Sequence, residues 1–150
     1  MYLLATREFA DLASRDEGRA IFRWLATADP GPRDLFVSAI SIGIVASSIE
    51  DMPKQERGHW RRLLAEARRL FVDKNTVVPV DLPIVDTWAS DLRGLEIYDE
   101  EDEGGDRFEL GEGERLVIAV AIARGLTLVS QPRAYLDEIC DRTTLTIVNP

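Results

Sequence analysis

Short apolar runs alternate with stretches of helical periodicity along this chain of 150 residues, and that alternation limits the folds it can adopt. Strands that alternate with helices predict a parallel sheet covered by helices on both faces. We therefore expect an α/β protein, a three-layer α/β/α sandwich with a mainly parallel five-stranded sheet, in a single domain over residues 1–150. The expected strands are residues 1–5, 35–40, 76–80, 126–130 and 145–148.

The helices between these runs have recognisable limits. Gly125 is a natural left-handed terminator for the helix that precedes it. Pro79 has no N–H to donate to a neighbouring strand, so its strand is expected at an edge of the sheet. The expected helices are residues 7–14, 17–27, 41–51, 54–72, about 81–92, 112–124 and a short helix begun by Pro132.

Negative charge is concentrated in one segment of the chain. The formal net charge is -9, and residues 98–114 hold nine of the 27 acidic residues but only one of the 18 basic ones. An acidic surface repels the phosphate backbone of nucleic acids, which argues against non-specific binding to RNA. Because the segment leads directly into Glu114, we expect it to border any cleft beside that residue.

Several classes of protein are excluded by the sequence. The first expected strand is followed by ATREF, not by a glycine-rich phosphate-binding loop, so a nucleotide-binding sandwich is not expected. The apolar runs have the length of strands, and no basic residues precede an apolar leader. A cytoplasmic protein without a membrane segment is therefore predicted.

Four stretches, in order and at matching spacing, resemble PIN domains of the VapC and FitB type, which occur in bacterial toxin–antitoxin pairs. The resemblance covers essentially the whole chain, and it implies a PIN-like fold. Family members are metal-dependent ribonucleases. The stretches are MYLLAT where the family reads MYLLDT, FVSAISIG where it reads FVSAITLGE, LVIAVAIARGLTLVS where it reads LIAATALxHGLTLVT, and the closing Val148-Asn149-Pro150.

The resemblance also implies where the catalytic acids should lie. In the family they come from the end of the first strand, the helix after the second, the start of the helix before the fourth, and the segment after the fourth. Those positions here hold Ala5, Ile44, Glu114 and Tyr135. Glu114 is thus the one retained acid of the quartet, the candidate catalytic residue and the candidate metal ligand if any metal binds.

A divalent metal site is not expected at these positions. Magnesium is usually held through one or two protein carboxylates together with substrate phosphates. One glutamate lined by alanine, isoleucine and tyrosine is a poor site, so we expect no cofactor, or Mg²⁺ or Mn²⁺ if nuclease activity remains. Helical spacing places Ile44 off the apolar stripe of its helix, facing the cleft. That stripe is Ile42, Val45, Ala46 and Ile49.

A basic side chain could supply the positive charge that a metal would bring. Arg7 stands where the family usually has asparagine, and we hypothesise that it pairs with Glu114, with the Tyr135 hydroxyl as a third partner. The alternative is an exposed Arg7 on the helix surface. Whether further acids compensate is left open, because most such residues are simply solvated. Those acids are Glu8, Asp11, Glu112 and Asp137.

Three functions are compatible with these residues. The first is a degenerate PIN-domain protein without metal-dependent ribonuclease activity, which acts by protein binding as a homodimer or with an antitoxin-like partner. The second is a metal-dependent endoribonuclease toxin with a rearranged site. The third is a small-molecule binding module that uses an apolar cleft near Ile44 and Tyr135.

Overall fold

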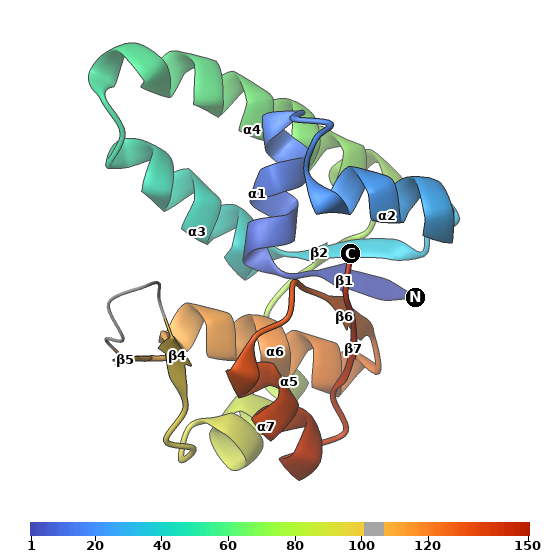
Figure 1. Cartoon of the computed structure of the whole chain (residues 1–150), viewed down its shortest axis with the longest axis vertical. Helices are drawn as coiled ribbons and strands as arrows, with labels where there is room; N and C mark the ends of the chain where they lie inside the picture. Colours follow the sequence, from blue (N-terminus) through green and yellow to red (C-terminus); the bar gives the residue numbers. More distant parts are fainter. Residues whose placement is uncertain (101–106) are drawn as a thin grey trace.

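A computed structural model describes residues 1–100 and 107–150, and its main sheet has five parallel strands in the order β3-β2-β1-β6-β7 (Figure 1). The predicted mainly parallel sheet is confirmed. Pairing of β1 with both β2 and β6 brings the carboxyl ends of β1 and β6 side by side. The strands are β1 (Tyr2–Leu4), β2 (Leu35–Ser38), β3 (Val77–Val78), β6 (Thr127–Val129) and β7 (Thr146–Val148).

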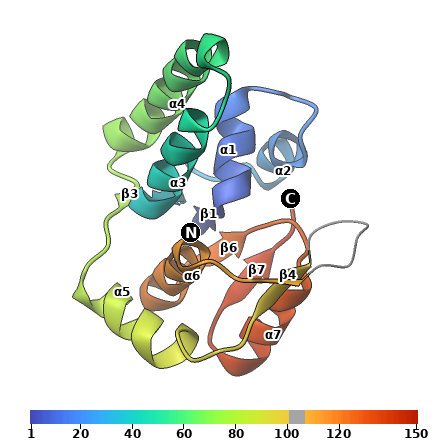
Figure 2. The ribbon, with the colours of Figure 1, turned by 90° about the vertical axis from the view of Figure 1, so that its left-hand side faces the viewer.

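Helices cover both faces of this sheet, as Figures 1 and 2 show, so the predicted three-layer arrangement is also confirmed. None of the helices among the described residues is long and apolar enough to cross a membrane. One layer contains α1 (Thr6–Ser14), α2 (Ala20–Ala28), α3 (Ala39–Glu50) and α4 (Lys54–Lys74). The other contains α5 (Leu82–Thr87), the π-helical turn η1 (Trp88–Leu92), α6 (Glu112–Arg124) and α7 (Ala134–Arg142).

The sheet separates two hydrophobic cores. Successive residues of a strand point to opposite faces, so neighbouring positions of one strand enter different cores. Leu3 and Leu128 pack with α5, α6 and α7, whereas Leu4 and Val129 pack with α1, α2 and α4, and all four are nearly inaccessible to solvent. One sheet thus organises both cores, while the single domain over residues 1–150 stays a prediction.

Several element limits differ from the predicted ones; for example, the strand expected over residues 35–40 ends at Ser38, where α3 begins at Ala39. Two of the differences have local reasons. The expected helix 17–27 begins at Ala20, because the Asp16 carboxylate accepts hydrogen bonds from the Gly18 N–H (3.1 Å) and from Arg19 Nε (3.0 Å) and holds a turn there. The expected helix 81–92 is α-helical only to Thr87 and continues as η1. The predicted edge position of β3 is confirmed by the strand order.

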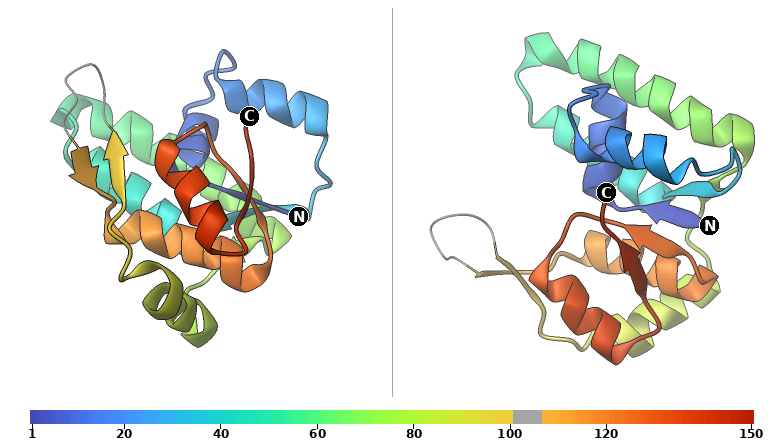
Figure 3. Two further views of the ribbon diagram at one scale, coloured as in Figure 1. Left: turned by 60° about the horizontal axis from the view of Figure 1, so that its bottom comes forward. Right: turned by 45° about the vertical axis from the view of Figure 1, so that its right-hand side comes forward.

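A small antiparallel hairpin, which the sequence analysis missed, lies within the acidic segment 98–114. It pairs β4 (Tyr98–Glu100) with β5 (Arg107–Glu109), and it stands apart from the main sheet beside the start of α6 (Figure 3). Residues 101–106, which carry much of the predicted acidic run, lie outside the described residues. The hairpin does adjoin the start of α6, where Glu114 lies.

The base of this hairpin is held by one buried arginine. Arg115, almost completely buried, donates from Nη1 to the carbonyl oxygens of Leu92 (2.6 Å) and Leu95 (2.9 Å). Its Nε donates to the carbonyl oxygen of Leu110 (3.0 Å). Because a buried guanidinium needs partners for its donors, these carbonyls tie the chain on both sides of the hairpin to the first turns of α6.

Candidate functional site

A small polar pocket of about 110 Å³ lies at the carboxyl ends of β1 and β6. In α/β proteins this edge of the sheet is where ligands bind. Three of the four positions predicted from the family quartet, Ala5, Glu114 and Tyr135, line this pocket, so the fold brings them together. The other lining residues are Thr6, Arg7, Glu8, Ser130, Gln131 and Arg133.

Ile44, the fourth predicted position, does not line the pocket. Its side chain packs against the first turn of α6, where a Cβ added to Gly113 would come within 2.8 Å of Ile44 Cδ1. A side chain at position 113 would displace the end of the Ile44 side chain, so α3 and α6 approach closely here. The pocket beside Tyr135 does not include Ile44, and an apolar cleft shared by these two residues stays a prediction.

The predicted apolar stripe of α3 needs correction. Ala46 is exposed, whereas Ser41, which the predicted stripe does not include, is completely buried with its Oγ 3.4 Å from Thr6 Oγ1. The reason is that α3 is packed from several sides, by α4, by α1 and by α6. A helix in that position has no single apolar face, so periodicity alone could not place its residues.

Glu8 is buried in the pocket, although such acids were expected to be solvated. Only 2% of the residue is exposed, and Oε1 accepts a hydrogen bond from the Gln131 N–H at 2.9 Å. No described group forms a hydrogen bond with Oε2. Burial raises the pKa of the Glu8 carboxyl; the nearby Asp11 acts in the same direction, while the Gln131 N–H and Arg7 act against it.

Two arginines flank the carboxylates of the pocket. Arg7 is exposed and lines the same pocket as Glu114, and the pairing of these two residues stays a prediction. Arg133, which directly precedes α7, is half-buried in the same pocket. Glu114, Arg133 and Tyr135 each have an interaction partner in the structure. The family pattern does not include Arg133, and no sequence signal identified it.

The remaining acids that the sequence left open lie elsewhere. The Asp11 carboxylate is 3.8 Å from Arg19 Nε, and the Glu112 carboxylate accepts a hydrogen bond of 2.8 Å from Trp88 Nε1. Asp137 is exposed on α7. Of these candidates, only Glu8 joins Glu114 in the pocket.

This donor set does not fit a divalent metal ion. Among residues 1–100 and 107–150, no three His, Cys, Asp or Glu side chains are grouped so that they could hold one. The residues that line the pocket include two with carboxylates, Glu8 and Glu114, and two arginines, Arg7 and Arg133. Guanidinium groups compete with a cation for the same oxygens, so Mg²⁺ or Mn²⁺ is disfavoured.

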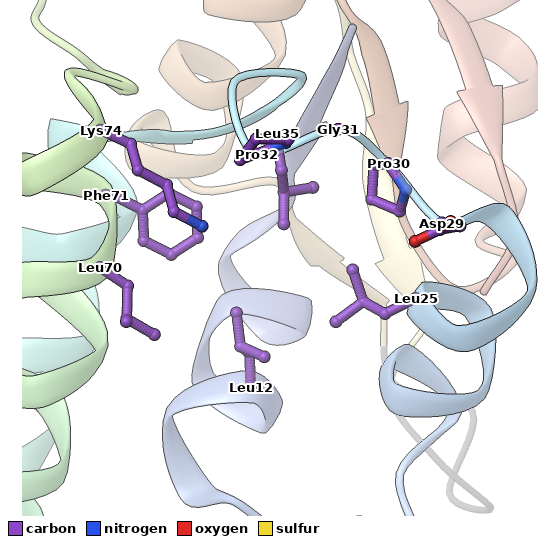
Figure 4. A pocket seen from close by; sticks show the side chains of 10 residues that line it. All are labelled: Leu12, Leu25, Asp29, Pro30, Gly31, Pro32, Leu35, Leu70, Phe71 and Lys74. Atoms are coloured by element: carbon purple, nitrogen blue, oxygen red, sulfur yellow. The ribbon is translucent and has the colours of Figure 1, made fainter.

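A larger and mostly apolar pocket of about 280 Å³ lies at the opposite end of the sheet, by the start of β2 (Figure 4). Leu70 at its edge is 54% exposed. The turn 29–32 closes one side, with the Asp29 carboxylate at the rim, and Lys74 closes another. Sequence patterning marked the turn but not the pocket, whose apolar walls come from four separate elements. Those walls are Leu12, Leu25, Leu35, Leu70 and Phe71.

Comparison with solved structures identifies the fold of this chain. No protein-family model and no curated protein matches the chain. The crystal structure of FitAcB from Neisseria gonorrhoeae is similar over 100% of this chain and 98% of that chain, with 18% identity and a TM-score of 0.72. VapBC2 from Rickettsia felis, bound to a promoter DNA fragment, is similar over 99% and 98%, with 16% identity and a TM-score of 0.65. VapBC from Salmonella typhimurium, also bound to DNA, is similar over 99% and 96%, with 16% identity and a TM-score of 0.63. The chain therefore has the PIN-like fold of FitB and VapC toxins.

Proposed function

We propose that this chain is a degenerate PIN-fold protein that lacks metal-dependent ribonuclease activity and acts by binding an antitoxin-like protein. The observation that carries the proposal is the donor set of the pocket. Ala5 and Tyr135 line it where the family resemblance leads one to expect acids, and the carboxylates of Glu8 and Glu114 lie beside two arginines. Such a pocket holds its own counter-charges and has no need of a metal ion.

The partner is proposed from the neighbours and from the apolar pocket. The similar structures are FitAcB and VapBC assemblies, which supports an antitoxin-like protein as the partner here. We propose that an apolar side chain of this partner fills the pocket beside Leu70, with an acidic group of the partner beside Lys74. An exposed leucine over an apolar pocket is typical of a protein-binding surface.

A homodimer is proposed on a second surface. Val80, Leu82 and Val85 are apolar and exposed at the start of α5, and Leu82 is 71% exposed. A second copy of the chain would cover them through the same patch on both subunits. We do not expect the two copies to pair through their edge strands β3. Pro79 directly follows this strand and has no N–H to donate to a neighbouring strand.

Glu8 also favours one alternative, a metal-dependent endoribonuclease with a rearranged site. It places a second carboxylate in the pocket of Glu114. Magnesium sites with two carboxylates can be completed by substrate phosphates. RNA could then supply the oxygens that the protein lacks.

Incubation of RNA with the full chain in Mg²⁺ or Mn²⁺ distinguishes the degenerate protein from the rearranged nuclease. The proposal expects no cleavage above that of the Glu114→Ala variant, and no rise of the melting temperature on addition of Mn²⁺. Cleavage that is lost in both Glu114→Ala and Glu8→Gln would instead establish the rearranged nuclease. The variant Asp137→Asn, exposed and outside the pocket, is the matched control.

A further inference from the structure

The first turn of α1 lines the polar pocket and carries donors that the helix itself does not satisfy. Ala5 is the N-cap residue, and its methyl group accepts no hydrogen bond, so the N–H groups of Thr6 and Arg7 have no partner within the helix. The Arg7 side chain lines the same pocket and adds a full positive charge to the partial charge of the helix end. This part of the pocket therefore suits a carboxylate group of a ligand.

A second observation in the same helical turn points to a cationic group on the ligand. Glu8 is 2% exposed and lines the pocket, and its Oε2 has no hydrogen-bond partner among the described residues. Its other oxygen, Oε1, already accepts from the Gln131 N–H at 2.9 Å. A buried carboxylate oxygen without a donor is costly, and an ammonium group beside Oε2 would remove that cost.

We propose that the pocket binds a small α-amino acid of the size of glycine or alanine. The carboxylate of this ligand lies at the first turn of α1 beside Arg7, and its ammonium group donates to Glu8 Oε2. One carbon atom separates the two charged groups of such a molecule, and Arg7 and Glu8 are neighbours in the same turn. The pocket of about 110 Å³ is far smaller than those that hold drug-sized molecules, which restricts the ligand to a minimal side chain.

The remaining charged residues of the pocket are not needed for this binding. Glu114, Arg133 and Tyr135 already have interaction partners, so they act as walls of the pocket. The surface proposed for the protein partner is the apolar pocket at the opposite end of the sheet. The amino acid and the protein partner could therefore be bound at the same time.

Calorimetric titration of glycine and alanine into the full chain tests the proposal. Both are expected to bind with a dissociation constant in the millimolar range or below, and to shift the NMR signal of the Gln131 amide, which lies beside Glu8. Acetate and methylamine each carry only one of the two charged groups, so each should bind about tenfold or more weakly than glycine. Free phenylalanine, which is too large for the pocket, should not bind.

Two variants assign the contacts. Arg7→Ala and Glu8→Gln each remove one charged contact and should weaken glycine binding about tenfold or more. Arg7 is exposed, so its variant should fold, and Glu8→Gln keeps an acceptor for the Gln131 N–H. The control is Asp137→Asn, exposed and outside the pocket, which should bind glycine as the unchanged chain does.

The outcomes distinguish this inference from the proposed function. Absence of glycine and alanine binding overturns the inference, and so does acetate binding equal to that of glycine, which would show a site for simple anions. Unchanged glycine affinity in both Arg7→Ala and Glu8→Gln overturns it as well. These results leave the proposed function standing, whereas cleavage of RNA by the unchanged chain in Mn²⁺ overturns the proposed function and not the amino-acid site.

Discussion

The two ends of the sheet offer a ligand opposite kinds of surface. The pocket at the carboxyl ends of β1 and β6 is small and contains two carboxylates and two guanidinium groups. The pocket at the start of β2 is larger and is walled by leucines and a phenylalanine. A metal site needs several oxygens at fixed positions, so exchange of a few ligand side chains is enough to abolish one. An apolar pocket tolerates exchange of one apolar side chain for another. Under the proposed function, the polar pocket is the part of the fold that has lost its chemistry, and the apolar pocket is the part that binds a partner.

The largest effect is expected at the apolar end. Phe71 is 4% exposed and packs edge to face on Phe9, with ring centroids 5.9 Å apart. Phe71→Ala should lower the free energy of unfolding by about 3–5 kcal/mol, because it leaves a cavity in the core. Urea unfolding measures the change. The neighbouring Leu70→Ala serves as the control, and an equal loss in both would show that Leu70 is as much a core residue as Phe71.

A smaller effect is expected when an acid is introduced at the polar end. Ala5 is 8% exposed and lines the pocket with Glu8 and Glu114. Ala5→Asp adds a third carboxylate, which should cost about 1–3 kcal/mol of stability without metal and be partly offset by Mn²⁺. Thermal melting with and without Mn²⁺ measures the loss of stability and the part of it that Mn²⁺ restores. The control is Ala39→Asp at an exposed position, and the same Mn²⁺ response there would contradict a site-specific effect.

The pH dependence of stability tests the burial of Glu8. Its folded-state pKa is raised above 4.5, so the stability it contributes is fully present below that value and is lost as the pH rises through the folded pKa. Glu8→Gln keeps an acceptor for the Gln131 N–H and has no carboxyl to ionise. The variant should lack this loss and be more stable than the unchanged chain above the folded pKa. Urea unfolding across the pH range checks the sign; a variant that is less stable at every pH would refute it.

The smallest change in stability is expected at the exposed rim of the apolar pocket. Leu70→Asp should alter the free energy of unfolding by no more than about 0.5 kcal/mol, because the side chain is largely in solvent. It should also leave the proposed homodimer intact, whereas Leu82→Asp should dissociate it. Sedimentation velocity compares the two variants. If Leu70→Asp dissociates the dimer and Leu82→Asp does not, the dimer contact lies at the apolar pocket and not at the start of α5.

The elements that sequence reasoning predicted are those with a local signal. Apolar runs marked the strands of the main sheet, Pro79 marked its edge and Gly125 the end of α6. The hairpin of β4 and β5 was missed because its charged residues show no apolar alternation. The π-helical turn after Thr87 likewise had no signal in the sequence.

The site was predicted in part for the same reason. Ala5, Glu114 and Tyr135 came from a linear pattern, and the fold does bring them into one pocket. Burial of Glu8 depends on Gln131, more than a hundred positions away, and no pattern of neighbouring residues reports such a contact. Arg133 enters the pocket through the same loop, so both residues could be found only once the strands were placed.

Arg115 has a consequence for how this architecture can vary. It closes the hairpin through main-chain carbonyls of Leu92, Leu95 and Leu110, and those groups are the same whatever side chains the intervening residues carry. Ile97 within this segment is buried in the core and must be kept, whereas the stretch beyond Ile97 can be exchanged while the same carbonyls hold the beginning of α6. That stretch is a natural position for grafting a foreign sequence into the scaffold.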